Sequence, residues 1–137
     1  MRDFTGRMFR ELLGQIVSTG HETLRIVDYA ERSTTQSLPD RFVIMRHDVD
    51  GNPENALCMA QSEQEQGICS TFYFRFRKHI FIPGIVQQIA AMGHEVGYHY
   101  EHLSDTNGDI PAAQRLFEES LASMREVVPI KTACMHG

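Results

Sequence analysis

Two short stretches of the chain carry side chains that can bind a metal ion or move a proton. The first is residues 46–50, RHDVD, in which Asp48 and Asp50 are separated by one residue. On a strand such residues lie on one face with Cα atoms about 6.6 Å apart, so both carboxylates can reach one site. One carboxylate could then bind a metal ion while the other accepts a proton from water. The alternative is that they are turn or helix-capping residues ahead of Gly51.

The second stretch ends in His99 and His102, which are three residues apart. Residues at this spacing are neighbours on a helical turn, so both imidazoles could reach one ion. With Asp50 they would form the three-ligand set of a catalytic zinc site, in which water takes the fourth position. The metal ion lowers the pKa of that water to near neutrality and so creates a nucleophile. The alternative is a pair of solvated histidines where a strand passes into a loop.

The chain has seven histidines, and most of the others fit structural roles better. His94 is five residues from His99 and therefore lies on the opposite face of a strand. His21 and His79 have no partner in the sequence, and His47 flanks the carboxylates without an assigned role. The three cysteines are odd in number and lack CxxC spacing, so we expect neither a disulfide framework nor a cysteine zinc site.

The polar clusters follow apolar, β-branched runs that predict strands. We expect strands at residues 23–27, 41–46, 70–76, 94–99 and 130–135. Helical spacing of apolar residues, with Asn52 and Asp109 as expected caps, predicts helices at residues 4–16, 53–66, 83–92 and 110–128. Residues 33–40 are polar, contain Pro39, and are expected to form a loop.

This alternation of strands and helices predicts an α/β fold with a parallel sheet and right-handed crossovers. In such sheets, and in (β/α) barrels, the chemistry collects at the carboxyl ends of the strands. Three of the four later strands end in a cluster of metal-ligand or acid-base residues, at residues 46–50, 99–102 and 134–136. The sequence therefore predicts one site at this edge of the sheet.

The composition sets the broad class of the protein. The chain has 137 residues, 42% of them apolar, and a formal net charge of -5. This apolar fraction can fill a core, which excludes a disordered or collagen-like chain, and the negative charge argues against a nucleic-acid partner. No 18-residue apolar run is present, so we expect no membrane span. The charged amino terminus lacks a signal-peptide pattern, which together with unpaired thiols favours a cytoplasmic location.

The motifs and their order resemble the polysaccharide deacetylase family, carbohydrate esterase family four. RHDVD at residues 46–50 is similar to a variant of the first family motif, which holds two aspartates. GHEVGYH at residues 93–99 is similar to the lead-in of the second motif, and ACMHG at residues 133–137 has the glycine of the third. The resemblance covers about residues 42–137.

The resemblance implies a distorted, typically seven-stranded (β/α) barrel. The strands read from the sequence are too few to close one, so we expect residues 1–137 to be a single domain that is a C-terminally truncated part of such a barrel. Residues 1–40 are expected to form a preceding helix, short strand and loop. An open parallel edge would favour self-association.

The resemblance also implies roles for individual residues. Asp48 would be the catalytic base, and Asp50 and His99 would be metal ligands. The usual family spacing would place the next ligand at Leu103, which cannot bind a metal ion, so His102 is expected to take that role. The backbone N–H of His136 would stabilise the oxyanion. The arginine usual in the third motif is missing, and the general acid would lie beyond residue 137.

The activity implied is hydrolysis of an N-acetyl group on a carbohydrate, with a divalent metal ion, expected to be Zn²⁺. Two alternatives stay open. One is a related hydrolase that acts on a non-sugar amide such as a cyclic ureide. The other is a pseudoenzyme or inactive fragment, which the shifted histidine spacing and the missing arginine favour.

Overall fold

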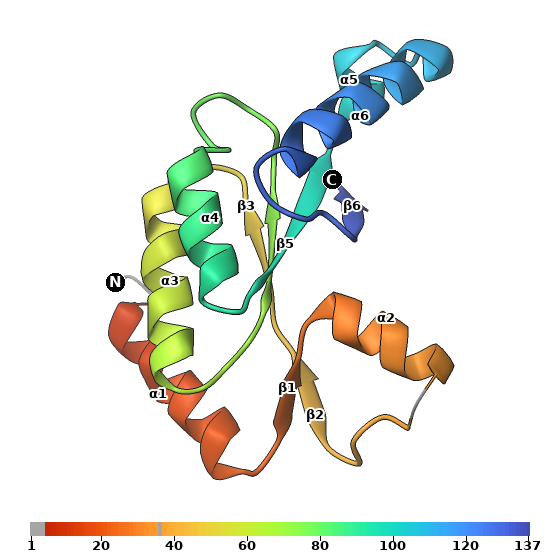
Figure 1. Cartoon of the computed structure of the whole chain (residues 1–137). Helices are drawn as coiled ribbons and strands as arrows, with labels where there is room; N and C mark the ends of the chain where they lie inside the picture. Colours follow the sequence, from red (N-terminus) through yellow and green to blue (C-terminus); the bar gives the residue numbers. More distant parts are fainter. Residues whose placement is uncertain (1–4, 36) are drawn as a thin grey trace.

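The computed structural model describes residues 5–35 and 37–137 (Figure 1). The first helix, α1 (Gly6–Ser18), begins where the Thr5 side chain accepts a hydrogen bond from the Met8 backbone N–H. Its apolar face buries Phe9 and Leu13 in a small cluster with Ile68. The expected helix is confirmed, although its predicted first residue, Phe4, lies outside the described residues.

Residues 20–35 and 37–45 contain a small parallel pair of strands with a helix between them in the sequence. Strand β1 (Glu22–Leu24) pairs with β2 (Phe42–Ile44), and α2 (Ile26–Thr35) connects them. The strand expected at residues 23–27 ends earlier and the loop expected at residues 33–40 begins later, because α2 occupies residues 26–35. Residue 36 lies outside the described residues, and residues 37–40 form neither helix nor strand, as expected. The first backbone N–H groups of α2 donate to side chains far along the chain, from Ile26 to Thr71 and from Val27 to Glu95.

The strand expected at residues 41–46 is divided at Met45 between two sheets. After β2, the chain continues as β3 (Arg46–Val49), which pairs with a different neighbour. Consequently His47 and Asp48 lie within a strand rather than after one. Asp50 is the first residue beyond it.

The main sheet has four parallel strands in the order β3–β4–β5–β6. Its parallel pairing confirms the predicted α/β class. The other strands are β4 (Thr71–Phe74), β5 (Glu95–Tyr100) and β6 (Ala133–Met135), and the helices between them are α3 (Pro53–Glu65), α4 (Pro83–Ala91), α5 (His102–Asp105) and α6 (Ile110–Arg125).

The Asp109 side chain caps α6 by accepting from the Ala112 N–H at 2.9 Å, as expected. Asn52 precedes α3, but within the described residues its side chain accepts no capping bond.

The two faces of the main sheet have different characters. One face carries alternate apolar residues, among them Phe72, Phe74 and Tyr98, which are buried in the core with residues of α3, α4 and α6. Phe76, expected to continue this row, is 37% exposed because β4 ends before it. The opposite face carries Tyr73, His99 and other polar or small residues. Helices α3, α4 and α6 therefore cover one face, and the polar side chains gather on the other.

Two buried carboxylates, Glu63 and Glu95, form hydrogen bonds between different elements of the fold. Glu95 accepts hydrogen bonds from the Val27 N–H at 3.0 Å, from Thr71 at 2.7 Å and from Thr132 at 2.5 Å. Glu63 of α3 is fully buried and accepts from Ser70 at 2.5 Å. Such bonds compensate for the loss of hydration that burial imposes on a carboxylate.

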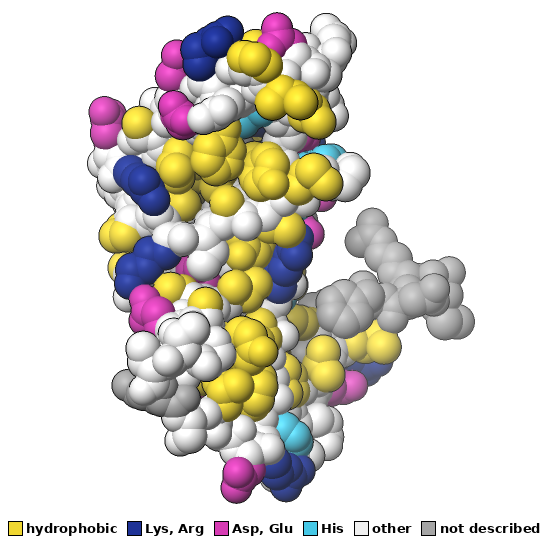
Figure 2. Space-filling model, turned by 90° about the vertical axis from the view of Figure 1, so that its right-hand side faces the viewer, with side chains coloured by type: hydrophobic (Ala, Val, Ile, Leu, Met, Phe, Trp, Pro, Cys, Tyr) yellow, Lys and Arg dark blue, Asp and Glu magenta, His cyan; other side chains and the backbone are white. Residues whose placement is uncertain are grey.

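No helix in the described part of the chain is long and apolar enough to cross a membrane. On the face drawn in Figure 2, apolar side chains form broad patches, and positive and negative side chains are interspersed among them.

Candidate functional site

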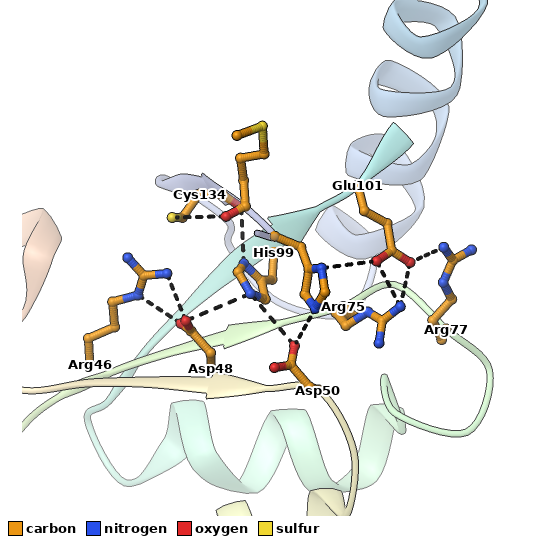
Figure 3. A network of polar contacts seen from close by, with 10 residues as sticks. Arg46, Asp48, Asp50, Arg75, Arg77, His99, Glu101 and Cys134 are labelled. Carbon is orange, nitrogen blue, oxygen red and sulfur yellow. Dashed lines mark hydrogen bonds and ion pairs between the residues drawn. The ribbon is translucent and has the colours of Figure 1, made fainter. Parts of the chain in front are cut away.

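The predicted carboxylates and histidines meet at the carboxyl ends of β3, β5 and β6 (Figure 3). One ligand atom from each of Asp50, His99 and His136 lies within 4.8 Å of the other two. Asp50 Oδ1 is 3.6 Å from His99 Nε2 and 3.4 Å from His136 Nε2. The structure therefore brings Asp50 and His99 together as expected, and adds the imidazole of His136.

Asp48 lies beside this cluster, with Oδ2 3.7 Å from His99 Nε2. Its two oxygens accept hydrogen bonds from the Arg46 guanidinium at 2.7 and 2.8 Å. Hydrogen bonding to Asp48 raises the pKa of Arg46. The guanidinium also lies over the ring of Tyr73, 5.0 Å from its centroid. Arg46 thus orients Asp48, and its role was not predicted from the sequence. The signal was present, because Arg46 and Asp48 are two residues apart and therefore lie on the same face of a strand.

His99 is held firmly in the sheet and is only 3% exposed. Its Nδ1 lies 3.1 Å from the carbonyl oxygen of Cys134 on the neighbouring strand. Since a carbonyl oxygen can only accept, this hydrogen bond occupies Nδ1 with its N–H and leaves Nε2, on the side of the aspartates, as the nitrogen that can bind a metal ion. That is the tautomer needed for an Nε2 metal ligand.

His136 takes part through its side chain and not as expected through its backbone. Its N–H donates to the Tyr100 carbonyl oxygen at 2.7 Å, which continues the pairing of β5 and β6 one residue further. Because that N–H is engaged in the ladder, the expectation that it serves as an oxyanion donor is not met in this structure. The imidazole, with Nε2 toward Asp50, is 28% exposed.

His102 lies on the other side of β5, away from the Asp50–His99 cluster. It begins the short helix α5, with Nε2 hydrogen-bonded to the Tyr98 hydroxyl and its ring beside Phe117. Tyr98 and His99 are consecutive strand residues and so point to opposite faces. The helical turn that begins at His102 directs its imidazole to the Tyr98 side, and the structure does not bring it to the expected metal site.

A charged group borders the cluster at Glu101. Arg75 Nη2 donates to both carboxylate oxygens at 2.6 and 2.7 Å, and Arg77 Nη2 donates to one of them and to Asp105. Burial alone would raise the pKa of Glu101, but the hydrogen bonds and charges of the two arginines outweigh it and lower the pKa to about 2. Neither arginine was predicted as a site residue from the sequence.

The cluster is open to solvent and has room beside it. The Asp50 side chain is 52% exposed, and a hollow of about 380 Å³ adjoins His136, with Tyr100, Asn107 and Met135 in its wall. A second hollow of about 340 Å³ lies on the side of Asp48. Water can therefore reach the Asp50 carboxylate, and the two hollows lie beside His136 and Asp48.

Comparison of the chain with protein-family models, with curated proteins and with solved structures finds no match.

Proposed function

We propose that this chain is a metal-dependent hydrolase of the polysaccharide deacetylase type, which removes N-acetyl groups from a carbohydrate. The observation that carries the proposal is the meeting of Asp50, His99 and His136, with Asp48 alongside. Two imidazoles and one carboxylate, with a position left for water, are a donor set that suits Zn²⁺. The proposed ligand set replaces His102 by His136.

The neighbouring residues support a hydrolytic role for this cluster. A zinc ion bound there would activate water and polarise the acetyl carbonyl. Asp48, 3.7 Å from His99, is placed to accept the proton from the attacking water. Its bidentate partner Arg46 holds the carboxylate in place beside the cluster.

The arrangement of the sheet supports a barrel-type architecture. Helices α3, α4 and α6 pack on one face of the parallel strands. The other face carries the polar side chains and is contacted only at Thr71 and Glu95 by the first turn of α2 among the described helices. In (β/α) barrels an outer ring of helices surrounds the strands, and catalytic residues come from several carboxyl ends. A doubly wound sheet would instead have helices on both faces.

Zinc titration by calorimetry tests the proposal directly. The unmodified chain is expected to bind one equivalent, and Asp50→Ala, His99→Ala and His136→Ala should each weaken binding at least tenfold. His102→Ala separates the two possible ligand sets, and exposed His79→Ala is the matched control; both should bind zinc as the unmodified chain does. Absence of zinc binding, or a loss confined to His102→Ala, would overturn the proposed site.

Acetate release from N-acetylglucosamine oligomers tests the reaction. Zinc-loaded protein should release acetate, and Asp48→Asn should lower the rate at least a hundredfold while retaining zinc, because removal of a general base typically costs about 10²–10⁴-fold. Zinc binding without acetate release, together with hydrolysis of a cyclic ureide, would assign the site to the non-sugar amide instead.

A further inference from the structure

One carboxylate at the site has no part in the proposed hydrolysis. Glu101 lies two residues after His99, on the same side of the chain as that ligand, and its side chain is only 13% exposed. Its Oε2 is 3.5 Å from Nδ1 of His136. Two arginines that follow β4, Arg75 and Arg77, also donate hydrogen bonds to its carboxylate (Figure 3).

Each imidazole of the cluster has one nitrogen toward Asp50 and the other toward a hydrogen-bond acceptor. For His99 the acceptor is the Cys134 carbonyl, at 3.1 Å from Nδ1. For His136 it is the Glu101 carboxylate. Histidines that bind metals almost always donate their second N–H to such a partner, which fixes the tautomer and the orientation of the ring.

We propose that Glu101 is a positioning residue for the metal site, which holds the His136 imidazole with Nδ1–H toward its carboxylate and Nε2 toward Asp50. This role rests on the proposed metal site. Unlike His99, which sits in the middle of the sheet, His136 follows the last strand and is 28% exposed. It therefore depends more on a side-chain partner for its orientation.

Arg75 and Arg77 make Glu101 a rigid partner. Arg75 Nη2 contacts both carboxylate oxygens, and Arg77 is itself anchored to Asp105 at 2.7 Å. The two guanidinium groups balance the charges of Glu101 and Asp105, so the arrangement adds no net charge beside the aspartates of the site. Asp105 shares the arginine cluster but contacts His102 and not His136, which makes it the matched control.

Metal affinity and a spectroscopic signature test the positioning role. Glu101→Ala should weaken zinc binding about 10–100-fold, the usual effect of losing an outer partner of a metal-bound histidine, and should change the visible absorption of the Co²⁺-substituted chain. Glu101→Gln, which keeps the size of the side chain, should show a smaller loss. Asp105→Ala should bind zinc within about threefold of the unmodified chain.

A measurement on the metal-free chain tests the orientation of the His136 ring separately from metal affinity. Nitrogen-15 NMR should show a larger Nδ1–H fraction for His136 in the unmodified chain than in Glu101→Ala, because the variant keeps only the Asp50 carboxylate on the other side of the ring. The same tautomer distribution in both chains would overturn the role of Glu101.

The outcomes separate this role from the proposed function. If folded Glu101→Ala binds zinc and Co²⁺ as the unmodified chain does, the positioning role is wrong and the metal site stands. Equal losses in Glu101→Ala and Asp105→Ala would also overturn it, because the effect would then belong to the arginine cluster as a whole. If the unmodified chain binds no zinc, the proposed function itself fails.

Discussion

Replacement of Gly97 by alanine is the sharpest test of how the polar face of the sheet is packed. Gly97 lies in the middle of β5 and pairs with Tyr73 of β4. An added Cβ would lie 2.3 Å from Cε1 and 2.4 Å from Cδ1 of the Tyr73 ring, and 3.2 Å from the Thr132 carbonyl oxygen. Cε1 and Cδ1 are part of a rigid ring, so the whole side chain has to move.

The expected loss of stability follows from what holds that ring. Overpacking of a full core costs about 1–3 kcal/mol, and displacement of Tyr73 breaks its 2.9 Å hydrogen bond to Thr132, which contributes about 1 kcal/mol. Reduced freedom of the unfolded chain offsets about 0.4–1 kcal/mol of this. Gly97→Ala should therefore lower the free energy of unfolding by about 1–3 kcal/mol.

Urea unfolding followed by circular dichroism measures this loss, and a double-mutant cycle locates its origin. In a Tyr73→Leu background the ring is absent, so the Gly97→Ala change should cost less than about 0.5 kcal/mol. Gly84→Ala is the control, because nothing lies within 4 Å of a Cβ placed on that helical residue; it should leave stability unchanged or raise it by up to about 1 kcal/mol. A loss of the same size in both backgrounds would show that the ring contact is not the cause.

Three further predictions concern buried polar groups and a helix cap. Glu63 is fully buried, so Glu63→Ala should cost about 3–5 kcal/mol in urea unfolding, whereas exposed Glu65→Ala should change stability by less than about 0.5 kcal/mol; similar effects would contradict the buried network. Burial lowers the pKa of His94, so at pH 6 nitrogen-15 NMR should find a smaller protonated fraction than in a histidine peptide. Because the unfolded chain takes up that proton first, this histidine should reduce stability as the pH falls below about 6.5, and an equal protonated fraction would refute it. Asp109→Ala removes the cap of α6 and should cost about 0.5–2 kcal/mol, with most of it recovered in Asp109→Asn; no difference between the two variants would contradict a capping role.

The elements that the sequence predicts well are those whose signals are local. The apolar spacing and bounding glycines of α3 and α4, and the Asp109 cap of α6, are contained within one window of sequence. Helix α2 was missed because its first N–H groups are satisfied by Thr71 and Glu95, which are 45 and 68 residues away from their donors. A strand-like run can start a helix when such distant acceptors are present.

The site residues likewise divide into those that local sequence signals predict and those that depend on distant contacts. Asp50 and His99 follow from the rule that parallel strands bring their carboxyl ends to one edge, and the structure does bring them together. The placement of His102 depends on where β5 gives way to α5, and strand and helix would direct its imidazole differently. The sequence predicted His136 only for its backbone N–H. The place of its side chain in the cluster could have been found by strand alternation, since His136 lies two residues after Cys134, the register partner of His99.

The six residues of β5 serve two purposes at once, because Tyr98 and Tyr100 fill the core while Gly97 and His99 serve the site. The two sets differ only in being odd or even along the strand. Loss or gain of a single residue early in β5 would exchange them, turning the tyrosines toward the aspartates and burying the histidine under α6. The length of this segment is therefore constrained more strictly than its individual residues. Its register in the sheet matters to the site as much as its side chains do.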